Sequence, residues 1–251
     1  MTILAVETAT SFQSVAVVGE DGLCATERVK QTRYSATSQD RSHRWSIMPA
    51  IDRLLNALNV TLRDIDALAV SIGPGSFTGL RVGLATMKGL AHGANKPLVA
   101  VPTLQALAFN ASGLGLPICT LLDAKRGELF LAVFHAPHDS LVCAMEPQRL
   151  PIENVVDTLS LHVHGTVIVL GDGVPLCRQM LSERFGQQAV FPSEIACLPS
   201  AISVAHVGKE RLARGMLAGA GLTPIYLRPP DATANLPHRA VRPSTPSGTE
   251  T

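Results

Sequence analysis

Two acidic residues and a glycine-rich turn are the parts of this sequence that could do chemistry. Glu7 and Asp123 each end a short apolar run, and paired carboxylates at such positions can hold Mg²⁺ on a nucleotide. The glycine-rich turn, residues 73–79, follows the apolar run 67–72 and leads into a helical pattern. A glycine turn between a strand and a helix can direct backbone N–H groups at a phosphate. Nucleotide binding is therefore the first function to weigh.

The turn does not match a known phosphate-binding motif. No Gly-Lys-Ser/Thr follows it, and Gly73, Gly75 and Gly79 do not have the spacing of a GxGxxG fingerprint. From the pattern alone, a structural turn and an anion site are equally compatible with these glycines. For Glu7 and Asp123 we favour a structural role in which each acid caps a turn between strands, since no third acid accompanies them.

Glycines continue into the helix that follows the turn. Gly79, Gly83 and Gly89 lie inside the helical pattern, and each costs roughly 1 kcal/mol relative to alanine. Gly79 and Gly83 are four residues apart and share one stripe of the helix. This stripe favours close packing, and we expect another helix to approach there.

Composition narrows the class of protein. The chain has 251 residues, of which 46% are hydrophobic and 16% charged, so it can bury a large core. Its net charge of +1 argues against a dedicated nucleic-acid binder. The five cysteines are scattered and include no CxxC pair, as in reduced cytosolic proteins. The sequence begins without the features of a signal peptide, and no run approaches the ~18 apolar residues of a membrane span. We therefore expect a cytoplasmic protein without membrane contact.

Hydrophobic periodicity predicts strands and helices in the same order twice. The first part reads as strands 3–6, 14–18 and 23–29, a helix at about 42–58, strand 67–72, a helix at 76–93, strand 98–101 and a helix at 103–111. The second part reads as strands 118–122, 128–135 and 141–146, a helix at 151–161, strand 167–170, a helix ending near 185 and a helix at 200–216.

The repetition also holds residue by residue. With a shift of 116 positions, Ile3–Val18 falls on Cys119–Phe134 without a gap, and Glu7 meets Asp123. This internal duplication predicts two similar lobes. We expect an N-terminal lobe over 1–112, with the last helix packing back on it, and a C-terminal lobe over 113–228. The proline-, serine- and threonine-rich tail, 229–251, has too little apolar surface to fold.

Five segments together resemble the TsaB family. These are ILAVETAT with SVAVV near the N-terminus, His43 with IMPAI at 47–51, GPGSFTGLRVG at 73–83, LLDAKRGELF at 121–130 and PIYLR at 224–228. The resemblance covers about residues 1–228, and the GPGSFTGLR string is highly specific. It implies an α/β protein with an actin-like (ASKHA) fold, in which two RNase H-like lobes carry mixed β-sheets flanked by helices.

The resemblance also implies a function. TsaB is a partner subunit of the bacterial machinery that makes threonylcarbamoyladenosine (t6A) beside the anticodon of tRNA. It acts as a non-catalytic scaffold and activator of the related transferase TsaD. The ATPase TsaE joins the pair, tRNA is reached through the complex, and TsaB forms a homodimer when TsaD is absent. No cofactor is expected to bind firmly, although ATP or ADP is expected at the complex interface.

The resemblance assigns a pairing surface to the helices at about 42–58 and 76–93. The implied partner-binding residues are His43, Ile47, Ile51, Leu54, Gly75, Ser76, Phe77, Thr78, Gly79, Arg81, Gly83 and Met87. TsaD binds metal through an HxxxH helix, and its two histidines fall here on Thr103 and Leu107, which cannot form a metal site. No catalytic residue is expected. If a nucleotide bound this chain, Glu7 and Asp123 would lie closest to it.

Two enzyme classes remain as alternatives. An ATP-dependent phosphotransferase of the ASKHA type would need phosphate loops on both lobes and a catalytic aspartate, and no convincing set is present. A metallopeptidase relative of TsaD would need the histidines that Thr103 and Leu107 replace.

Overall fold

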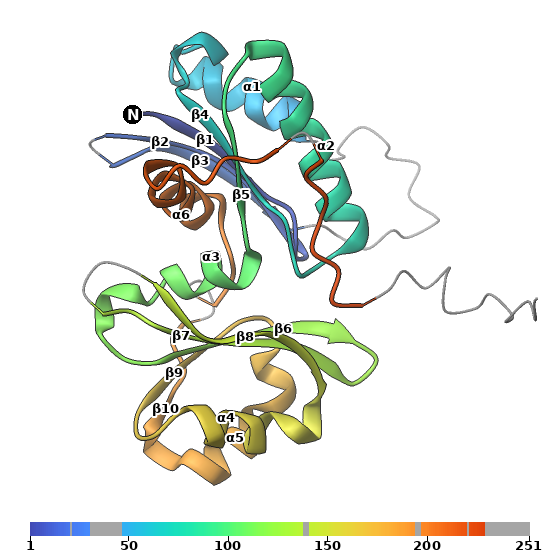
Figure 1. Ribbon diagram of the computed structural model, residues 1–251, viewed down its shortest axis with the longest axis vertical. Coiled ribbons are helices and arrows are strands. Elements are labelled where there is room, and N and C mark those ends of the chain that lie inside the picture. Colours follow the sequence, from blue (N-terminus) through green and yellow to red (C-terminus); the bar gives the residue numbers. More distant parts are fainter. Residues whose placement is uncertain (21, 31–46, 138–140, 194–196, 220, 229–251) are drawn as a thin grey trace, which may run out of the picture.

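The chain folds around two five-stranded β-sheets (Figure 1). The computed structural model describes residues 1–20, 22–30, 47–137, 141–193, 197–219 and 221–228. In the first sheet the strand order is β3-β2-β1-β4-β5; β1 pairs antiparallel with β2 and parallel with β4. Its strands are β1 (Ile3–Glu7), β2 (Phe12–Gly19), β3 (Gly22–Lys30), β4 (Ala67–Ser71) and β5 (Leu98–Val101).

The second sheet repeats this topology, with the order β10-β9-β6-β7-β8. Its strands are β6 (Ile118–Lys125), β7 (Glu128–His135), β8 (Val142–Pro151), β9 (Val167–Leu170) and β10 (Ala189–Val190). β7 lies 116 positions after β2, as the internal duplication predicts. Pairing differs by one residue, because Ile3 faces Val18 whereas Cys119 faces Val133, and the β6–β7 register shifts just before Lys125. Two mixed sheets of one topology confirm the actin-like fold class.

Helices cover both faces of the first sheet. The helices of the chain are α1 (Ile47–Ala57), α2 (Phe77–Ala94), α3 (Thr103–Phe109), α4 (Val155–His162), α5 (Val174–Phe185) and α6 (Ala201–Ala213). Short 3₁₀ turns are η2 (Leu62–Asp64), η3 (Ser112–Leu114), η4 (Ile152–Asn154) and η5 (Gly186–Gln188). α1 and α2 pack on one face, while α6 follows the second lobe in sequence and packs on the other face (Figure 1).

The second sheet has its own cores. α4 and α5 share a buried apolar cluster with one face, and α3 shares one with the other face, which it separates from the first lobe. Among the described residues, no helix combines the length and the apolar character needed to cross a bilayer.

Three predicted boundaries differ from the structure. The helix predicted at 151–161 starts with η4 and becomes α-helical only at Val155, because Pro151 still pairs with Glu128 in the sheet. The helix predicted at 200–216 ends at Ala213, and Gly215 then adopts a positive φ of 73°. The first residues of the helix predicted at 42–58 lie outside the described part of the chain.

After α6, a segment without regular structure runs along α2 to the second lobe (Figure 1). We call the described residues 216–219 and 221–228 the C-terminal strap. Backbone hydrogen bonds join it to the first lobe: Ala218 N–H donates to Leu98 O at 2.8 Å, and Ile225 N–H donates to Ile72 O at 2.7 Å. At its end, Arg228 Nη1 donates to Ala124 O at 2.5 Å in the second lobe. The strap therefore contacts both lobes.

Candidate functional site

The glycine turn is anchored at its first residue. Gly73 N–H donates to the Thr103 hydroxyl at 3.1 Å, and Thr103 N–H donates back to Gly73 O at 2.9 Å. Gly73 has a φ of 112°, and a β-carbon there would lie 2.5 Å from Ile225 O of the strap. Only glycine meets both conditions, since L side chains rarely adopt this φ. The turn is thus fixed between α3 and the strap.

The glycine stripe of α2 faces the chain's own first lobe. Gly79 and Gly83 are buried, and a β-carbon on either would overlap Thr8, which follows β1. For Gly79 the obstacle is the backbone oxygen of Thr8, and for Gly83 it is the hydroxyl. The expectation that these two glycines admit a helix of another chain is therefore wrong, because Thr8 already fills the space.

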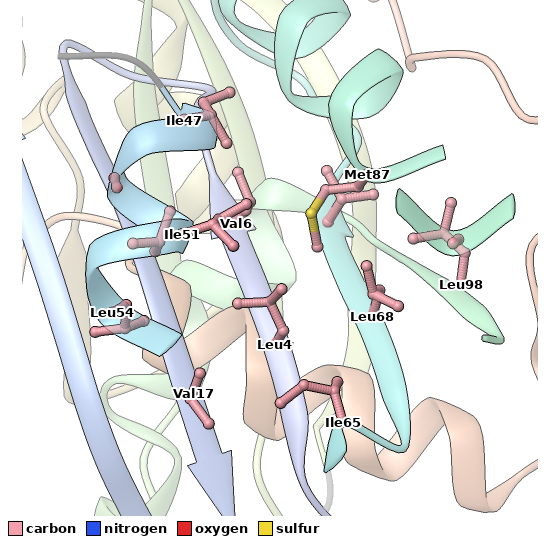
Figure 2. Packing of buried hydrophobic residues seen from close by; sticks show 14 of the residues in the cluster. Leu4, Val6, Val17, Ile47, Ile51, Leu54, Ile65, Leu68, Met87 and Leu98 are labelled. Carbon is pink, nitrogen blue, oxygen red and sulfur yellow. The ribbon is translucent and has the colours of Figure 1, made fainter. Parts of the chain in front are cut away.

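Several other expected contact residues belong to the core. Ile47, Ile51, Leu54 and Met87 are all at most 5% exposed. Figure 2 shows the three α1 side chains directed at the sheet and Met87 beside Leu68. Their helical spacing marks the buried face of α1 and α2, so their side chains cannot form a surface for a partner. The prediction that these four side chains form a pairing surface is therefore wrong.

The start of α2 does lie at the surface. Ser76, Phe77, Thr78 and Arg81 are exposed, while Gly75 is half-buried. The Ser76 hydroxyl accepts from Gly79 N–H at 3.2 Å and so caps the helix. His43 lies outside the described residues.

An aromatic and cationic cluster occupies this exposed end. The rings of Phe77 and Tyr226 lie 4.9 Å apart at an angle of 34°, and the Arg81 guanidinium lies 4.8 Å from the centre of the Phe77 ring. Tyr226 belongs to the strap, so a residue distant in sequence completes the cluster. Sequence reasoning placed Tyr226 in a motif but gave it no role at the site.

Sequence reasoning also missed the outer apolar residues of α1 and α2. Met48 is 47% exposed and Val82 is 50% exposed. Val82 lies nearly opposite the buried stripe of α2, so the helical period of 3.6 could have identified it. Met48 lies three residues before Ile51 and seven before Leu55, so the period groups it with the core of α1, and only the structure shows its exposure.

Glu7 and Asp123 each hold the turn that follows their strand. A Glu7 carboxylate oxygen accepts from Ala9 N–H, and an Asp123 oxygen accepts from Lys125 N–H at 2.7 Å. Asp123 also pairs with the Lys125 ammonium. Asp172 in turn accepts from Asp123 N–H at 2.9 Å. These contacts are those of turn-capping acids.

The two acids nevertheless differ in environment. Glu7 is fully buried, and burial raises the pKa of its carboxyl to about 7, against the hydrogen bond from Ala9 N–H and the charge of Arg28. Its second oxygen and the Thr8 hydroxyl have no hydrogen-bond partner among the residues that the structure describes. Asp123 is partly exposed and neutralised by its lysine.

Thr103 and Leu107 have structural contacts in this chain. The Thr103 hydroxyl accepts from Gly73 N–H, and Leu107 is completely buried in the apolar cluster between α3 and the second sheet. Within the described part of the chain, no group of three histidine, cysteine, aspartate or glutamate residues is placed to hold a metal ion.

Comparison with known proteins identifies the family to which this chain belongs. The family model of TsaD, tRNA N6-adenosine threonylcarbamoyltransferase, matches residues 34–233, which is most of the chain. The chain belongs to the TsaD family. Within it, the TsaB protein of Bacillus subtilis is 29% identical over 93% of this chain and 97% of its own length. The TsaB protein of Escherichia coli is 28% identical over 94% of this chain and 99% of its own length.

A solved structure agrees with these relatives. YeaZ from Pseudomonas aeruginosa superposes with a TM-score of 0.72 and 25% identity, covering 90% of this chain and 99% of its own. The full-length relatives confirm the resemblance to the TsaB family that the sequence motifs predicted.

Proposed function

We propose that this chain is a non-catalytic subunit of t6A biosynthesis that pairs with a TsaD transferase and activates it. The relatives that match it from end to end are named tRNA threonylcarbamoyladenosine biosynthesis proteins, which supports this pathway. A TsaE ATPase joins the pair, and tRNA reaches this chain through the complex. In the absence of TsaD, two copies of the chain pair with each other.

The observation that carries the proposal is that Thr103 and Leu107 have structural contacts and are not metal ligands. At the positions that the resemblance assigns to the metal-binding histidines of TsaD, this chain has a hydroxyl that anchors the glycine turn and a leucine inside a core. Neither side chain is a metal ligand of the usual kinds. The transfer chemistry therefore comes from the partner.

The pairing surface that we propose is the outer face of α1 and α2. Met48 and Val82 are large apolar side chains exposed on neighbouring helices, and Phe77 and Arg81 are exposed at the start of α2. Methionine, aromatic residues and arginine are enriched in protein interfaces. In this proposal, the exposed residues take the place of the buried residues of α1 and α2 that the sequence analysis assigned to the pairing surface.

Co-purification with the TsaD and TsaE homologues of the same host tests the proposal. Val82→Glu should abolish pairing, because it places a charge in an apolar interface. Leu161→Glu is the matched control, since Leu161 is 76% exposed on α4 of the other lobe and should pair normally. Normal pairing of Val82→Glu would place the interface elsewhere.

The same preparation tests the absence of catalysis. The purified chain alone should neither form t6A nor hydrolyse ATP in the presence of Mg²⁺ or Zn²⁺. When it is added to TsaD, TsaE and a source of the activated substrate threonylcarbamoyl-adenylate, it should stimulate t6A formation. Turnover by the chain alone that disappears in Asp123→Asn would contradict a scaffold role.

A further inference from the structure

Before the strap, the chain passes between the two lobes twice, and the two passages are bonded to each other. The first passage runs from α3 to β6, and the second runs from β10 back to α6. The Asn110 side chain, just after α3, donates to Leu198 O of the second passage at 3.0 Å. The same side chain accepts from the Ser203 hydroxyl of α6. The two passages therefore form one hinge beside α3 and α6.

The strap connects the two lobes a third time. Its Ala218 and Leu222 side chains pack against the apolar cluster that α1 and α2 share with the first sheet. Its Leu227 side chain packs against the cluster that α3 shares with the second sheet. Figure 1 shows the strap running along α2 from one lobe to the other. One short segment is thus anchored in the cores of both lobes.

On the second lobe, the strap and the hinge contact opposite ends of β6. The first passage of the hinge leads into Ile118, where β6 begins. Arg228 of the strap donates to Ala124 O at 2.5 Å and to Lys125 O at 3.3 Å, where β6 ends. A strand rises about 3.3 Å per residue, so the two ends of β6 lie roughly 23 Å apart. The strap therefore resists opening of the hinge through a long lever arm.

The two ends of the strap are held by contacts of different kinds. On the first lobe, Ile225 N–H donates to Ile72 O at 2.7 Å, and Ile225 O fills the space beside Gly73. On the second lobe, the strap is bonded through the Arg228 side chain, which also pairs with the Glu128 carboxylate of β7. These two side chains are 20% and 26% exposed, so water and ions reach the pair and weaken it. The second-lobe end is therefore the one that can be released.

We propose that the strap is a latch that holds the second lobe against the first, and that release of Arg228 lets the lobes open about the hinge. The structure shows the latched state. In the released state the strap stays on the first lobe, while Leu227 and Arg228 leave the second lobe and the end of β6 moves away. The latch acts within the chain itself, so it goes beyond the proposed pairing with TsaD and does not rest on it.

Pulsed EPR on the full chain measures the distance between the lobes. One spin label is attached through Ala85→Cys on α2 and the other through Gln148→Cys on β8, both at exposed positions. Three native cysteines, at positions 24, 143 and 197, are first replaced by serine, and the other two are buried. The latched chain should give one narrow distance distribution. Arg228→Gln should add a population at longer distance, because a rotation of about 15° over the length of β6 moves its end by roughly 6 Å.

Arg149→Gln is the matched control for this experiment. The Arg149 guanidinium lies 3.7 Å from the same Glu128 carboxylate but belongs to β8, so its loss weakens that ion pair without touching the strap. This variant should keep the distribution of the wild type. If Arg228→Gln also keeps it, the strap only frays locally and the latch is refuted.

A milder variant keeps the test decisive if Arg228→Gln does not fold. Arg228→Lys retains the charge but loses the planar fork that reaches two carbonyls and a carboxylate together. It should show the longer distance as a smaller population than Arg228→Gln. A distribution identical to that of the wild type in a folded Arg228→Lys would equally overturn the latch.

Discussion

Filling the glycine stripe of α2 should affect folding through one contact. In Gly83→Ala the new methyl group would overlap the Thr8 hydroxyl and lie 3.3 Å from Thr8 Cγ2. Overpacking of this kind costs about 1–3 kcal/mol, and the helix propensity of alanine returns about 1 kcal/mol. We therefore expect a net loss of about 0–2 kcal/mol of unfolding free energy relative to the wild type.

A double-mutant cycle identifies the cause. Thr8→Ala removes the hydroxyl and the methyl group, and a β-carbon at position 83 then lies 3.4 Å from the Thr8 β-carbon, an ordinary contact. The Thr8 hydroxyl is buried and has no hydrogen-bond partner in the described part of the chain, so its removal costs little. The double variant should therefore be at least as stable as Thr8→Ala alone. The expected coupling between the two sites is about 1–3 kcal/mol.

Gly89→Ala is the matched control in the same helix. Gly89 is exposed, and a β-carbon there would lie within 4 Å of none of the described residues' atoms, so this variant should gain about 1 kcal/mol. Urea unfolding followed by circular dichroism measures all four variants. The reasoning fails if Gly83→Ala is as stable as Gly89→Ala, or if Thr8→Ala does not rescue it. Since Gly83 is buried, folded Gly83→Ala should still pair with TsaD, whereas the larger Gly83→Arg should not fold.

Two further predictions concern stability. Burial raises the pKa of the Glu7 carboxyl to about 7, against 4.5 for the free group, so folding favours its protonated form. The stability that this carboxyl contributes is therefore fully present below pH 4.5 and is lost as the pH rises through 7. Relative to Glu7→Gln, the wild type should lose about 2–3 kcal/mol of unfolding free energy between pH 5 and pH 8 in urea unfolding, and parallel pH profiles of the two proteins would contradict this. Truncation after Arg228 removes few apolar side chains and should leave the melting temperature nearly unchanged, so a large fall would show that the tail packs on a lobe.

Local pattern was sufficient to predict the architecture. Alternating and continuous apolar runs located the strands, and the duplication with its shift of 116 positions predicted two sheets of one topology. Both signals depend on neighbouring residues and on order along the chain, which a single sequence contains. Boundaries failed where sheet pairing extended into an expected helix, as at Pro151.

The site was harder to predict because its contacts are distant in sequence. Gly79 and Gly83 correctly indicated a close approach, but the stripe does not say which backbone approaches, and Thr8 does so within the same lobe. The period of α1 and α2 marked an apolar face that the resemblance assigned to a partner, although it is the core. Tyr226 joins Phe77 only after α6 returns to the first lobe and the strap crosses α2.

A helix can serve as a docking surface only if its position is fixed before the partner arrives, since ordering it on binding would reduce affinity. α2 meets this requirement through its inner side. Thr8 fills its glycine stripe, and the turn before it is bonded to Thr103 of α3 and covered by Ile225 of the strap. In the pairing that we propose, the glycines thus act indirectly: they hold α2 against its own lobe, and the opposite face of α2 would then meet the partner in one fixed position.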